Sequence, residues 1–300
     1  MNTELQENYD YIRAGGSGLY EQKRGLIAVR GKEAVQFLDG LISNDMKTLE
    51  DGAQMLAAFP NAQGRLLAVV RVLRQGDKFL FDTEELTREN IFQNLFRFTF
   101  AGDFFVEDLS ENYHYFEIYG DTSGTQPDGI FYTTTATTDR FIENDLNDDF
   151  IFANRASGAI GICDEIHEIL RIENGIPKYG VDMDETTIVP ELGIDGLISY
   201  NKGCYIGQEI IARIHFRGHV AKRLTGLESE PGAIATGFLP AAELTTTDGK
   251  NAGRITSVKY SPKLDKTIAL AFVRYDHLAE GTELNVDGHK ATVKELPFIR

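Results

Sequence analysis

The sequence predicts an α+β fold divided into two or three domains, on three observations. The chain has 300 residues, against the roughly 100–200 residues of a typical domain. Residues 55–98 read as three strands followed by a helix, an order that indicates an antiparallel sheet with helices packed on it. From about Lys222 onward, short apolar runs alternate with turn signals, which is typical of a small β-barrel or jelly-roll domain.

The N-terminal third contains a short helix and several strands. Three glycines cluster within residues 1–24, and we expect this segment to be loosely ordered. Residues 26–29 form a short apolar run typical of a strand. In residues 33–41, apolar side chains recur at helical spacing and predict a short amphipathic helix. Further strands are expected at residues 55–59, 66–73 and 78–82, with a turn at residues 61–64.

The middle of the chain mixes helix, loop and strand. Residues 84–98 place three apolar side chains on one face, which predicts an amphipathic helix. Residues 139–150 are polar and acidic, so we expect a surface loop there. Asp164 is a typical helix N-cap, and Gly175 stands where the left-handed residue after a helix is common. The two therefore bracket a short predicted helix.

The last 80 residues have an all-β texture. Two dipeptides, Asp248-Gly249 and Asp287-Gly288, are typical of tight hairpin turns. The boundary of this domain falls between Arg217 and Leu224. Strands are expected at residues 224–227, 255–260, 268–273, 283–286 and 291–296.

The chain is strongly acidic. It carries a formal charge of −16, from 30 basic and 46 acidic residues. A surface of this sign repels a phosphate backbone, so direct binding of nucleic acid is not expected. The longest apolar stretch, residues 66–73, is far shorter than the roughly 20 residues that a membrane-spanning helix needs. The polar N-terminus resembles neither a signal peptide nor a transit peptide, and we expect a cytoplasmic protein.

Cysteine and histidine spacing gives no metal signature. Cys163 and Cys204 lie far apart and form no CxxC pair. Cys163 stands in an apolar strand, where we expect it to be buried and inert. His215 and His219 are four positions apart, so they can share one face, but no third ligand is near in sequence and Gly218 indicates a turn between them. No metal site is expected.

The most informative segment runs from residue 202 to residue 209. It reads Lys202, Gly203, Cys204, Tyr205, Ile206, Gly207, Gln208 and Glu209. Glycines four positions apart allow tight turns and the close approach of a ligand. A lysine two residues before a thiol favours the reactive thiolate, so Cys204 is a candidate functional thiol. Read by itself, the segment also fits a plain glycine turn with a buried cysteine.

This segment resembles the K-G-C-[FY]-x-G-Q-E signature of the YgfZ family and matches it at every fixed position. The signature is long, and so it is far more specific than a lone glycine motif. The resemblance extends over roughly residues 25–298. The other segments that carry it are residues 37–45, 58–65, 171–182, 190–191 and 252–262.

The YgfZ family shares its fold with the glycine-cleavage T-protein. The resemblance therefore implies a cloverleaf of three domains around a folate site. A split N-terminal folate-binding domain would comprise residues 1–50 and 155–220. A ferredoxin-like α+β domain would comprise residues 51–154, and a C-terminal β-barrel or jelly-roll domain residues 221–300.

One departure from the T-protein pattern bears on the chemistry. T-proteins follow their Asn-x-x-Gly turn with a pair of aspartates, one of which helps to activate aminomethyl transfer. Counting from Asn61 and Gly64, these positions hold Ala68 and Val69. Neither side chain can take up a proton or stabilise a developing cation. The chain is therefore not expected to be an active aminomethyltransferase.

Tetrahydrofolate, the expected cofactor, makes three demands on a site. Its pterin ring presents adjacent N–H donors that suit a carboxylate, and the resemblance assigns this role to Glu191. Tyr205 is a candidate aromatic wall, and Asn61, in the family's Asn-x-x-Gly turn, is a further candidate contact. The glutamate tail needs cations, and residues 202–223 carry five of them, Arg213 included, against a single acid. A surface glutamate and a solvated basic face are the plain alternatives.

The resemblance implies a folate-binding accessory protein that supports iron–sulfur cluster assembly or repair in client enzymes, with indirect effects on tRNA modification. Folate and iron–sulfur client or assembly proteins are the expected partners. Two other functions stay open. The first is a folate-dependent one-carbon transferase that uses a base other than the missing aspartate. The second is a binding scaffold without chemistry, which a buried Cys204 would favour.

Overall fold

The computed structural model describes residues 3–100, 102–120, 129–231 and 237–299. The chain divides into two compact units, each assembled from segments that lie far apart in the sequence. The first unit comprises Met1–Ala34, Leu49–Met55 and Val70–His167, and the second comprises Val35–Thr48, Leu56–Val69 and Glu168–Arg300. The predicted limits of three domains, at residues 50, 154 and 220, stay a prediction.

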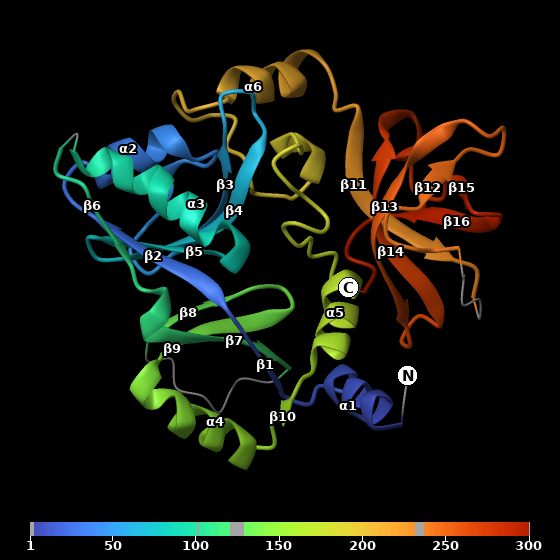
Figure 1. The fold of residues 1–300 in the computed structure, drawn as a ribbon, viewed down its shortest axis with the longest axis horizontal. Coiled ribbons are helices and arrows are strands. Elements are labelled where there is room, and N and C mark those ends of the chain that lie inside the picture. Colours follow the sequence, from blue (N-terminus) through green and yellow to red (C-terminus); the bar gives the residue numbers. More distant parts are fainter. Residues whose placement is uncertain (1–2, 101, 121–128, 232–236, 300) are drawn as a thin grey trace. The chain divides into compact units, whose positions relative to one another are not determined.

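Two five-stranded sheets shape the first unit (Figure 1). In the sheet of order β10-β1-β7-β9-β8, β10 pairs with β1 in parallel and the other pairs are antiparallel. Its strands are β1 (Gly18–Gln22), β7 (Tyr113–Tyr119), β8 (Ile130–Thr133), β9 (Thr137–Glu143) and β10 (Ile160–Gly161).

The second sheet has the order β3-β4-β5-β2-β6. Its strands are β2 (Arg24–Arg30), β3 (Gln54–Pro60), β4 (Leu66–Gln75), β5 (Lys78–Glu84) and β6 (Phe105–Asp108). The chain passes from one unit to the other within β3 and within β4. The helices among the described residues of the first unit are α1 (Thr3–Arg13), α3 (Glu85–Phe96) and α4 (Asn147–Ala156). Its short 3-10 helices are η2 (Arg97–Phe100), η3 (Ser110–Asn112) and η4 (Asn144–Leu146).

The core of the first unit lies between its two sheets. Leu26 and Leu80 come from one sheet, and Tyr115 and Phe141 come from the other, and all four belong to one buried cluster. Side chains from facing sheets interdigitate in this way because each sheet buries its apolar face against the other.

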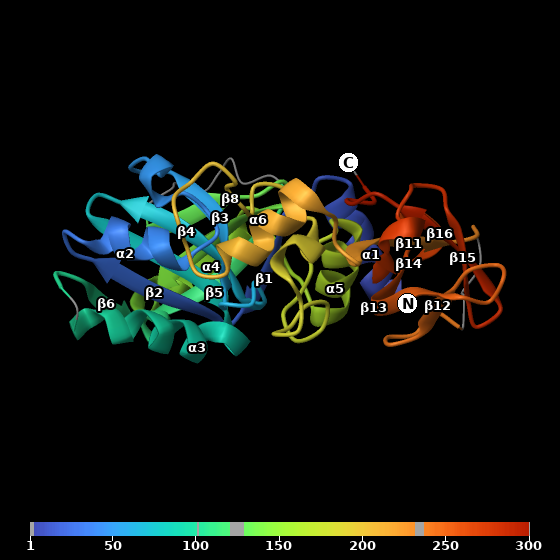
Figure 2. The ribbon, with the colours of Figure 1, turned by 90° about the horizontal axis from the view of Figure 1, so that it is seen from above.

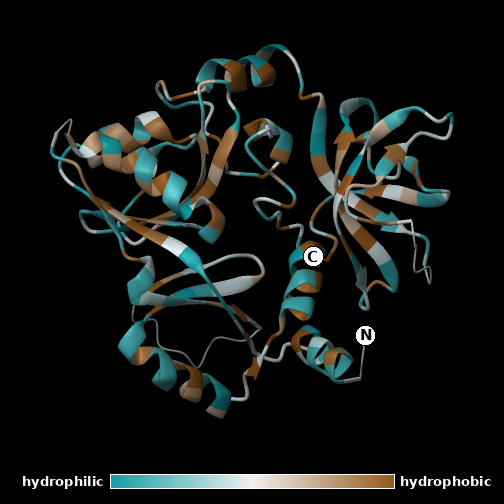
Figure 3. Cartoon of the chain, viewed as in Figure 1, coloured by the Kyte–Doolittle hydropathy of each residue, from teal (hydrophilic) through white to brown (hydrophobic). Residues whose placement is uncertain are grey.

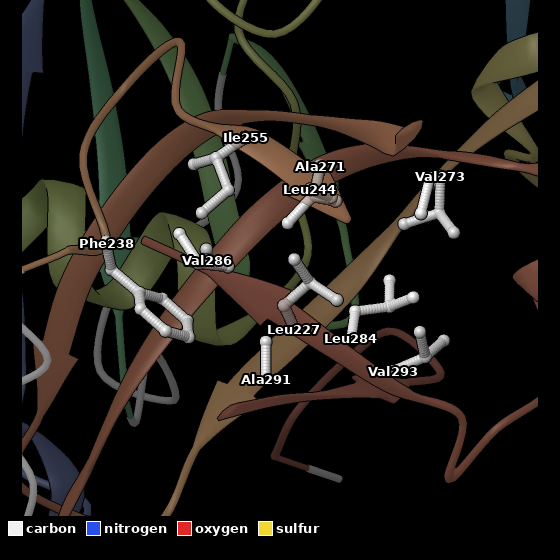
Figure 4. Packing of buried hydrophobic residues seen from close by; sticks show 12 residues of the cluster. Leu227, Phe238, Leu244, Ile255, Ala271, Val273, Leu284, Val286, Ala291 and Val293 are labelled. Carbon is white, nitrogen blue, oxygen red and sulfur yellow. The ribbon is translucent and has the colours of Figure 1, made fainter. Parts of the chain in front are cut away.

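A closed six-stranded barrel forms the C-terminal part of the second unit (Figures 1 and 2). Its order is β11-β14-β13-β12-β15-β16. The strands are β11 (Lys222–Ser229), β12 (Glu243–Thr245), β13 (Asn251–Ser261), β14 (Lys266–Arg274), β15 (Glu283–Val286) and β16 (His289–Lys294). Leu227, Leu284 and Val293 point toward one another among its buried side chains (Figure 4). The predicted C-terminal barrel is confirmed.

The rest of the second unit is built from short helices and loops. Its helices are α2 (Ala34–Leu41), α5 (Asp164–Glu173) and α6 (Gln208–Arg217), of which α2 and α5 begin in the first unit. Short 3-10 helices are η1 (Met46–Thr48), η5 (Val189–Leu192) and η6 (Tyr275–His277). The predicted helix at residues 33–41 is therefore confirmed as α2.

A buried arginine ties α5 to the barrel within the second unit. The Arg171 guanidinium donates to Asp182 Oδ2 at 2.8 Å, to Glu168 Oε2 at 2.8 Å and to Ser257 Oγ on β13 at 3.0 Å. Thr256, the neighbour of Ser257, donates to the other oxygen of Asp182 at 2.5 Å. Burial acts to lower the pKa of Arg171, but the two carboxylates outweigh it and raise this pKa.

Two local predictions were wrong. Residues 1–2 lie outside the described residues, but residues 3–24 are not loosely ordered, because they contain α1 and β1, and Tyr9 and Ile12 of α1 are buried. Residues 139–150 are not a loop, because they contain most of β9 and the start of α4. In β9 the polar run Thr137–Arg140 is buried, so local composition misled the prediction at this strand.

Two acids face each other inside the first unit. Asp139 on β9 is the register partner of Glu117 on β7, which places both carboxylates on one face of the sheet. Glu117 accepts hydrogen bonds from Gln22 and from Tyr119, and its Oε2 lies 2.9 Å from His167 Nε2. Oδ1 of Asp139 has no hydrogen-bond partner among the described residues. Burial, and then the charge of Glu117, raise the pKa of Asp139 to about 7.

Replacing Asp139 with Asn should stabilise the protein above neutral pH. The ordinary pKa of this carboxyl is 3.8, so the folded state holds the proton more tightly than the unfolded state does. The free energy of unfolding of the wild type therefore falls as pH rises from about 4 to about 7, by about 1.4 kcal/mol for each unit of pKa difference. The Asn variant lacks this fall.

Thermal unfolding at pH 5 and pH 8 checks this expectation. The Asp139→Asn variant should unfold at a higher temperature than the wild type at pH 8, and the difference should shrink at pH 5. Glu143→Gln, on the exposed end of the same strand, is the matched control and should follow the wild type. A lower midpoint for Asp139→Asn at pH 8 would contradict the assignment.

Candidate functional site

The signature segment is anchored by a buried lysine. Only 1% of the Lys202 side chain is exposed. Its Nζ donates to the main-chain oxygens of Asp39 at 2.6 Å, Ile42 at 3.0 Å and Asn44 at 2.6 Å. It also lies 3.1 Å from Oδ1 of Asp39. One ammonium therefore holds three carbonyls and a carboxylate of the second unit.

These carbonyls belong to the end of α2 and the loop after it. The last carbonyls of a helix have no partner within the helix, and a cation placed there satisfies them and suits the helix dipole. Burial lowers the pKa of Lys202, and its contact with Asp39 partly offsets that effect. Burial acts to raise the pKa of Asp39, but hydrogen bonds from Lys202 and Lys47 outweigh it and lower this pKa.

The role of Lys202 therefore differs from the predicted one. The sequence indicated that its charge would stabilise a thiolate at Cys204, whereas the ammonium is directed at the carbonyls after α2. The same loop makes a second contact with α2, because the Ile206 amide donates to the Gly40 carbonyl at 3.0 Å. Lys202 thus fixes the loop that presents the cysteine.

Gly207 allows the segment to pack closely against the Asn61–Gly64 turn. Its φ of +80° is rare for residues with a side chain, and a Cβ there would lie 2.4 Å from the carbonyl oxygen of Asn61. In the turn, Asn61 Oδ1 accepts from the amides of Gln63 at 2.9 Å and Arg65 at 3.0 Å. The predicted turn is confirmed, and the described contacts of the Asn61 side chain hold it.

The residues around Lys202 include exposed, half-buried and buried side chains. Cys204 is exposed and in no disulfide, and Gly203 and Glu209 are exposed as well. Gln208 Nε2 donates to the Gly203 carbonyl at 3.3 Å and so closes the loop onto the start of α6. The alternative of a buried cysteine in a plain turn is therefore wrong, because the structure places this thiol at the surface.

Tyr205 turns inward from the same loop. It is 8% exposed and belongs to an apolar cluster with Leu66 and Ile211. Its ring centroid lies 5.0 Å from the Lys202 ammonium, within the range of a cation–π contact. Burial, and then the neighbouring Tyr200, raise the pKa of Tyr205 to about 12. Its hydroxyl therefore stays protonated at neutral pH.

Glu191 is a buried carboxylate on η5. It is 5% exposed, and its Oε2 accepts from the Ile188 amide at 3.2 Å, which caps the short helix. Burial raises the pKa of Glu191, and the Ile188 amide, Lys222 and Arg65 partly offset that rise. Among the described residues, Ile188 is the donor that this carboxylate has within hydrogen-bond distance. The group keeps capacity to accept a further hydrogen bond.

The histidines near Cys204 diverge from each other. His215 stacks on Tyr200 with ring centroids 3.6 Å apart, and His219 stacks on Tyr275 at 3.7 Å. Each ring is therefore held by a different tyrosine. Within the described ranges, no group of three or more His, Cys, Asp or Glu side chains is placed to hold a metal ion. Arg213 is exposed on α6.

Cys163 is not buried, contrary to the prediction. It is exposed and lies just before α5, outside the two-residue strand β10. The apolar neighbours that suggested burial, such as Ile162, point inward while the cysteine does not. Accessibility therefore does not distinguish the two thiols.

Ala68 and Val69 lie on β4, as the sequence predicted for a plain strand. Ala68 is fully buried, and Val69 packs against the apolar cluster that contains Leu66. Neither position offers a group that can exchange a proton.

Sequence reasoning did not single out Asp39 and Ser43 as site residues. Ser43 is fully buried, and its hydroxyl donates to the Leu197 carbonyl at 2.6 Å and accepts from the Ala58 amide at 2.8 Å. It therefore fixes the loop that Lys202 also holds. The signal available in the sequence was the resemblance of residues 37–45 to the YgfZ family, which gave no role to individual side chains.

Replacing Lys202 with Met should lower the midpoint of thermal unfolding markedly. The change leaves Asp39 and three carbonyls without their cation, and removing one partner of a buried ion pair costs about 3–5 kcal/mol. Lys47 is the matched control, because it also contacts Asp39, at 3.2 Å, but its side chain is 64% exposed. Lys47→Met should cost less than about 1 kcal/mol. Equal losses in the two variants would show that Lys202 is not the anchor.

The chain has similarities with two kinds of protein. Residues 222–299 match the glycine cleavage T-protein C-terminal barrel domain. The chain is 25% identical over 335 residues to an aminomethyltransferase from Bdellovibrio bacteriovorus, covering 98% of this chain and 91% of that one. It is 28% identical over 232 residues to the mitochondrial iron–sulfur cluster assembly factor IBA57 homolog of Mycosarcoma maydis, covering 68% of this chain and 55% of the fungal one.

A solved structure shares the fold. The glycine cleavage system aminomethyltransferase T from Bartonella henselae superposes with a TM-score of 0.87 at 18% identity, covering 98% of this chain and 89% of that chain. The predicted α+β, multidomain, T-protein-like fold is thereby confirmed. The fold, the barrel and the two sets of relatives agree with the signature at residues 202–209. The chain belongs to the family that unites the glycine-cleavage T-proteins with the YgfZ-type proteins.

Proposed function

We propose that this protein binds tetrahydrofolate and supports the assembly or repair of iron–sulfur clusters in client enzymes. The observation that carries the proposal is the signature loop. Its lysine and Gly207 fix the backbone, and Cys204 is left exposed. Two relatives, from Mycosarcoma maydis and Dictyostelium discoideum, are described as iron–sulfur cluster assembly factors. Effects on tRNA modification would follow through client enzymes that contain clusters.

The residues present fit a folate. Glu191 is a buried carboxylate that keeps capacity to accept hydrogen bonds, as the N–H donors of a pterin require. Tyr205 supplies an aromatic wall, Arg213 an exposed cation for the glutamate tail, and Asn61 the adjoining turn. Tetrahydrofolate, when bound, supplies ring nitrogens that carry one-carbon units. All four side chains belong to the second unit.

Exchange of Glu191 for Gln tests the folate assignment. Glutamine keeps an oxygen for the Ile188 amide, so η5 should remain capped, but it loses the charge that the pterin donors would meet. A hydrogen bond to a charged group contributes about 1.5–3 kcal/mol, so affinity for tetrahydrofolate should fall by roughly 10- to 150-fold in a calorimetric titration. Glu185→Gln, an exposed change in the preceding loop, should bind like the wild type. If Glu191→Gln binds tetrahydrofolate with unchanged affinity, Glu191 does not contact the folate.

Cys204 is the side chain to which we assign the function in cluster chemistry. An accessible thiol can become the thiolate that attacks electrophiles and ligates metals. Its loop is held from both sides, by Lys202 and by Gly207, so the sulfur has a defined position. Cys163 is equally exposed, but it lies outside the signature.

The two cysteines form a matched pair for a test. Both thiols should be alkylated in the native protein by a small reagent at neutral pH, because both are exposed. Cys204→Ser should fold normally yet fail to restore iron–sulfur enzyme activity in a cell that lacks its own copy of the gene, whereas Cys163→Ser should restore it. Full restoration by Cys204→Ser would show that this cysteine has no function in cluster chemistry.

A folate-dependent one-carbon transferase is the second candidate. The aminomethyltransferases among the relatives, which align over up to 99% of this chain, favour it. The T-protein mechanism is disfavoured, because β4 carries Ala68 and Val69 at the two positions where T-proteins have aspartates. We expect no turnover of an aminomethylated lipoyl carrier protein above the uncatalysed rate. Turnover near that of a T-protein would favour this candidate over the first.

A cytoplasmic location stays a prediction from the sequence, and the relatives from Mycosarcoma maydis and Dictyostelium discoideum are described as mitochondrial. None of the helices in the described ranges is both long enough and apolar enough to cross a bilayer.

A further inference from the structure

The outer face of α6 carries side chains that the proposed folate site and thiol do not use. Phe216 is 66% exposed and Arg217 is exposed. Arg213, the cation assigned to the folate tail, lies one turn earlier on the same face. The inner face packs into the apolar cluster of the second unit through Ile211. Figure 3 shows that hydrophobic and hydrophilic residues are mixed along α6. A large apolar ring therefore stands among cations on an outer surface.

Phe216 is held in position by its neighbours. Its ring meets His215 edge-on, with centroids 4.7 Å apart and planes at 84°. It also meets Tyr200 edge-on, at 6.3 Å and 78°. Because His215 is itself stacked on Tyr200, the three rings form one cluster. An aromatic side chain that is fixed before binding loses little entropy on binding, which is typical of interface hot spots.

The charge around Phe216 is opposite to that of the whole chain. Residues 208–223 carry four cations, Arg213, Arg217, Lys222 and Arg223, against one carboxylate, whereas the chain has a net charge of −16. Within the described residues, neither Arg213 nor Arg217 lies in an ion pair. The Arg217 guanidinium, which the proposed folate site does not use, is therefore available to carboxylates on another molecule.

We propose that the outer face of α6 around Phe216 and Arg217 docks a protein that presents an apolar pocket bordered by carboxylates. Phe216 and Arg217 end α6, and the loop of Cys204 leads into the start of the same helix. That this protein is an iron–sulfur client or assembly protein rests on the proposed function, and the docking itself does not. A nucleic acid is disfavoured, because several phosphate contacts would have to overcome the net charge of the chain.

Helix α4 of the first unit provides a matched control. Phe152 is 76% exposed there, and Arg155 follows it at helical spacing, so the residue types are the same. The neighbouring residues Asp145, Asp148 and Asp149 are acidic instead of basic. If any exposed phenylalanine beside an arginine sufficed for docking, α4 would behave like α6.

The test uses the full chain with a photoreactive phenylalanine analogue at position 216 or at position 152. After irradiation in cells, the protein joined to position 216 is identified, purified and titrated against the variants. We expect an adduct at position 216 that resists nuclease, and none at position 152. Phe216→Ala and Arg217→Glu should each weaken binding of the purified partner about tenfold or more. Phe152→Ala and Arg155→Glu should leave it within twofold of the wild type.

Replacing a carboxylate at the partner's pocket with lysine should restore binding to Arg217→Glu. The proposal is overturned by a nuclease-sensitive adduct, by the absence of an adduct, by equal labelling at both positions, or by affinities within twofold for the α6 variants. Tetrahydrofolate binding, measured in parallel, should be unchanged in Phe216→Ala and Arg217→Glu. If the wild-type protein does not bind tetrahydrofolate, the proposed function is refuted, but the result on docking remains valid.

Discussion

The buried ammonium of Lys202 is the contact on which the candidate site depends. It satisfies carbonyls that the end of α2 leaves open, and it does so from a residue more than 150 positions further along the chain. Three consequences follow for the loop at residues 202–209. Its backbone is fixed to α2, Tyr205 is directed into the core, and Cys204 is turned to the surface. A cation in a core is costly unless it is fully paired, so this arrangement requires every one of these partners.

The loop is closed on its other side by backbone contact with the Asn61–Gly64 turn, which Gly207 permits. Both attachments lie within the second unit. The signature at residues 202–209 therefore contains residues of two kinds, structural and functional. Lys202 and Gly207 serve the architecture, whereas Cys204 is free to react. The loop leads into α6, whose last turn carries Phe216 and Arg217. A thiol and a docking surface on one continuous segment of the chain suit a protein that acts on other proteins.

Much of the fold was accessible from the sequence because it rests on local patterns. The periodicity of residues 33–41 predicted α2, and regularly spaced strands with Asp-Gly turns predicted the barrel. Long-range facts were not accessible. Local sequence does not predict that Lys202 is buried, because its burial depends on carbonyls at the end of α2, which lies far away in the chain. Asp139 and Arg140 were predicted to lie in a loop because no local signal shows that a polar strand is buried. Cys163 read as buried because its apolar neighbours, and not the cysteine itself, face the core.

The central claim, that Glu191 and its surroundings recognise a folate by its pterin, is tested most directly by calorimetry on the wild-type chain. One titration uses tetrahydrofolate, and the other uses p-aminobenzoylglutamate, which keeps the benzoyl ring and the glutamate tail but lacks the pterin. The account predicts saturable binding of one tetrahydrofolate per chain, and binding of the fragment at least about tenfold weaker, since a charged hydrogen bond to the pterin is missing. Absence of saturation by tetrahydrofolate up to about 1 mM, or equal binding of the fragment, would contradict the account.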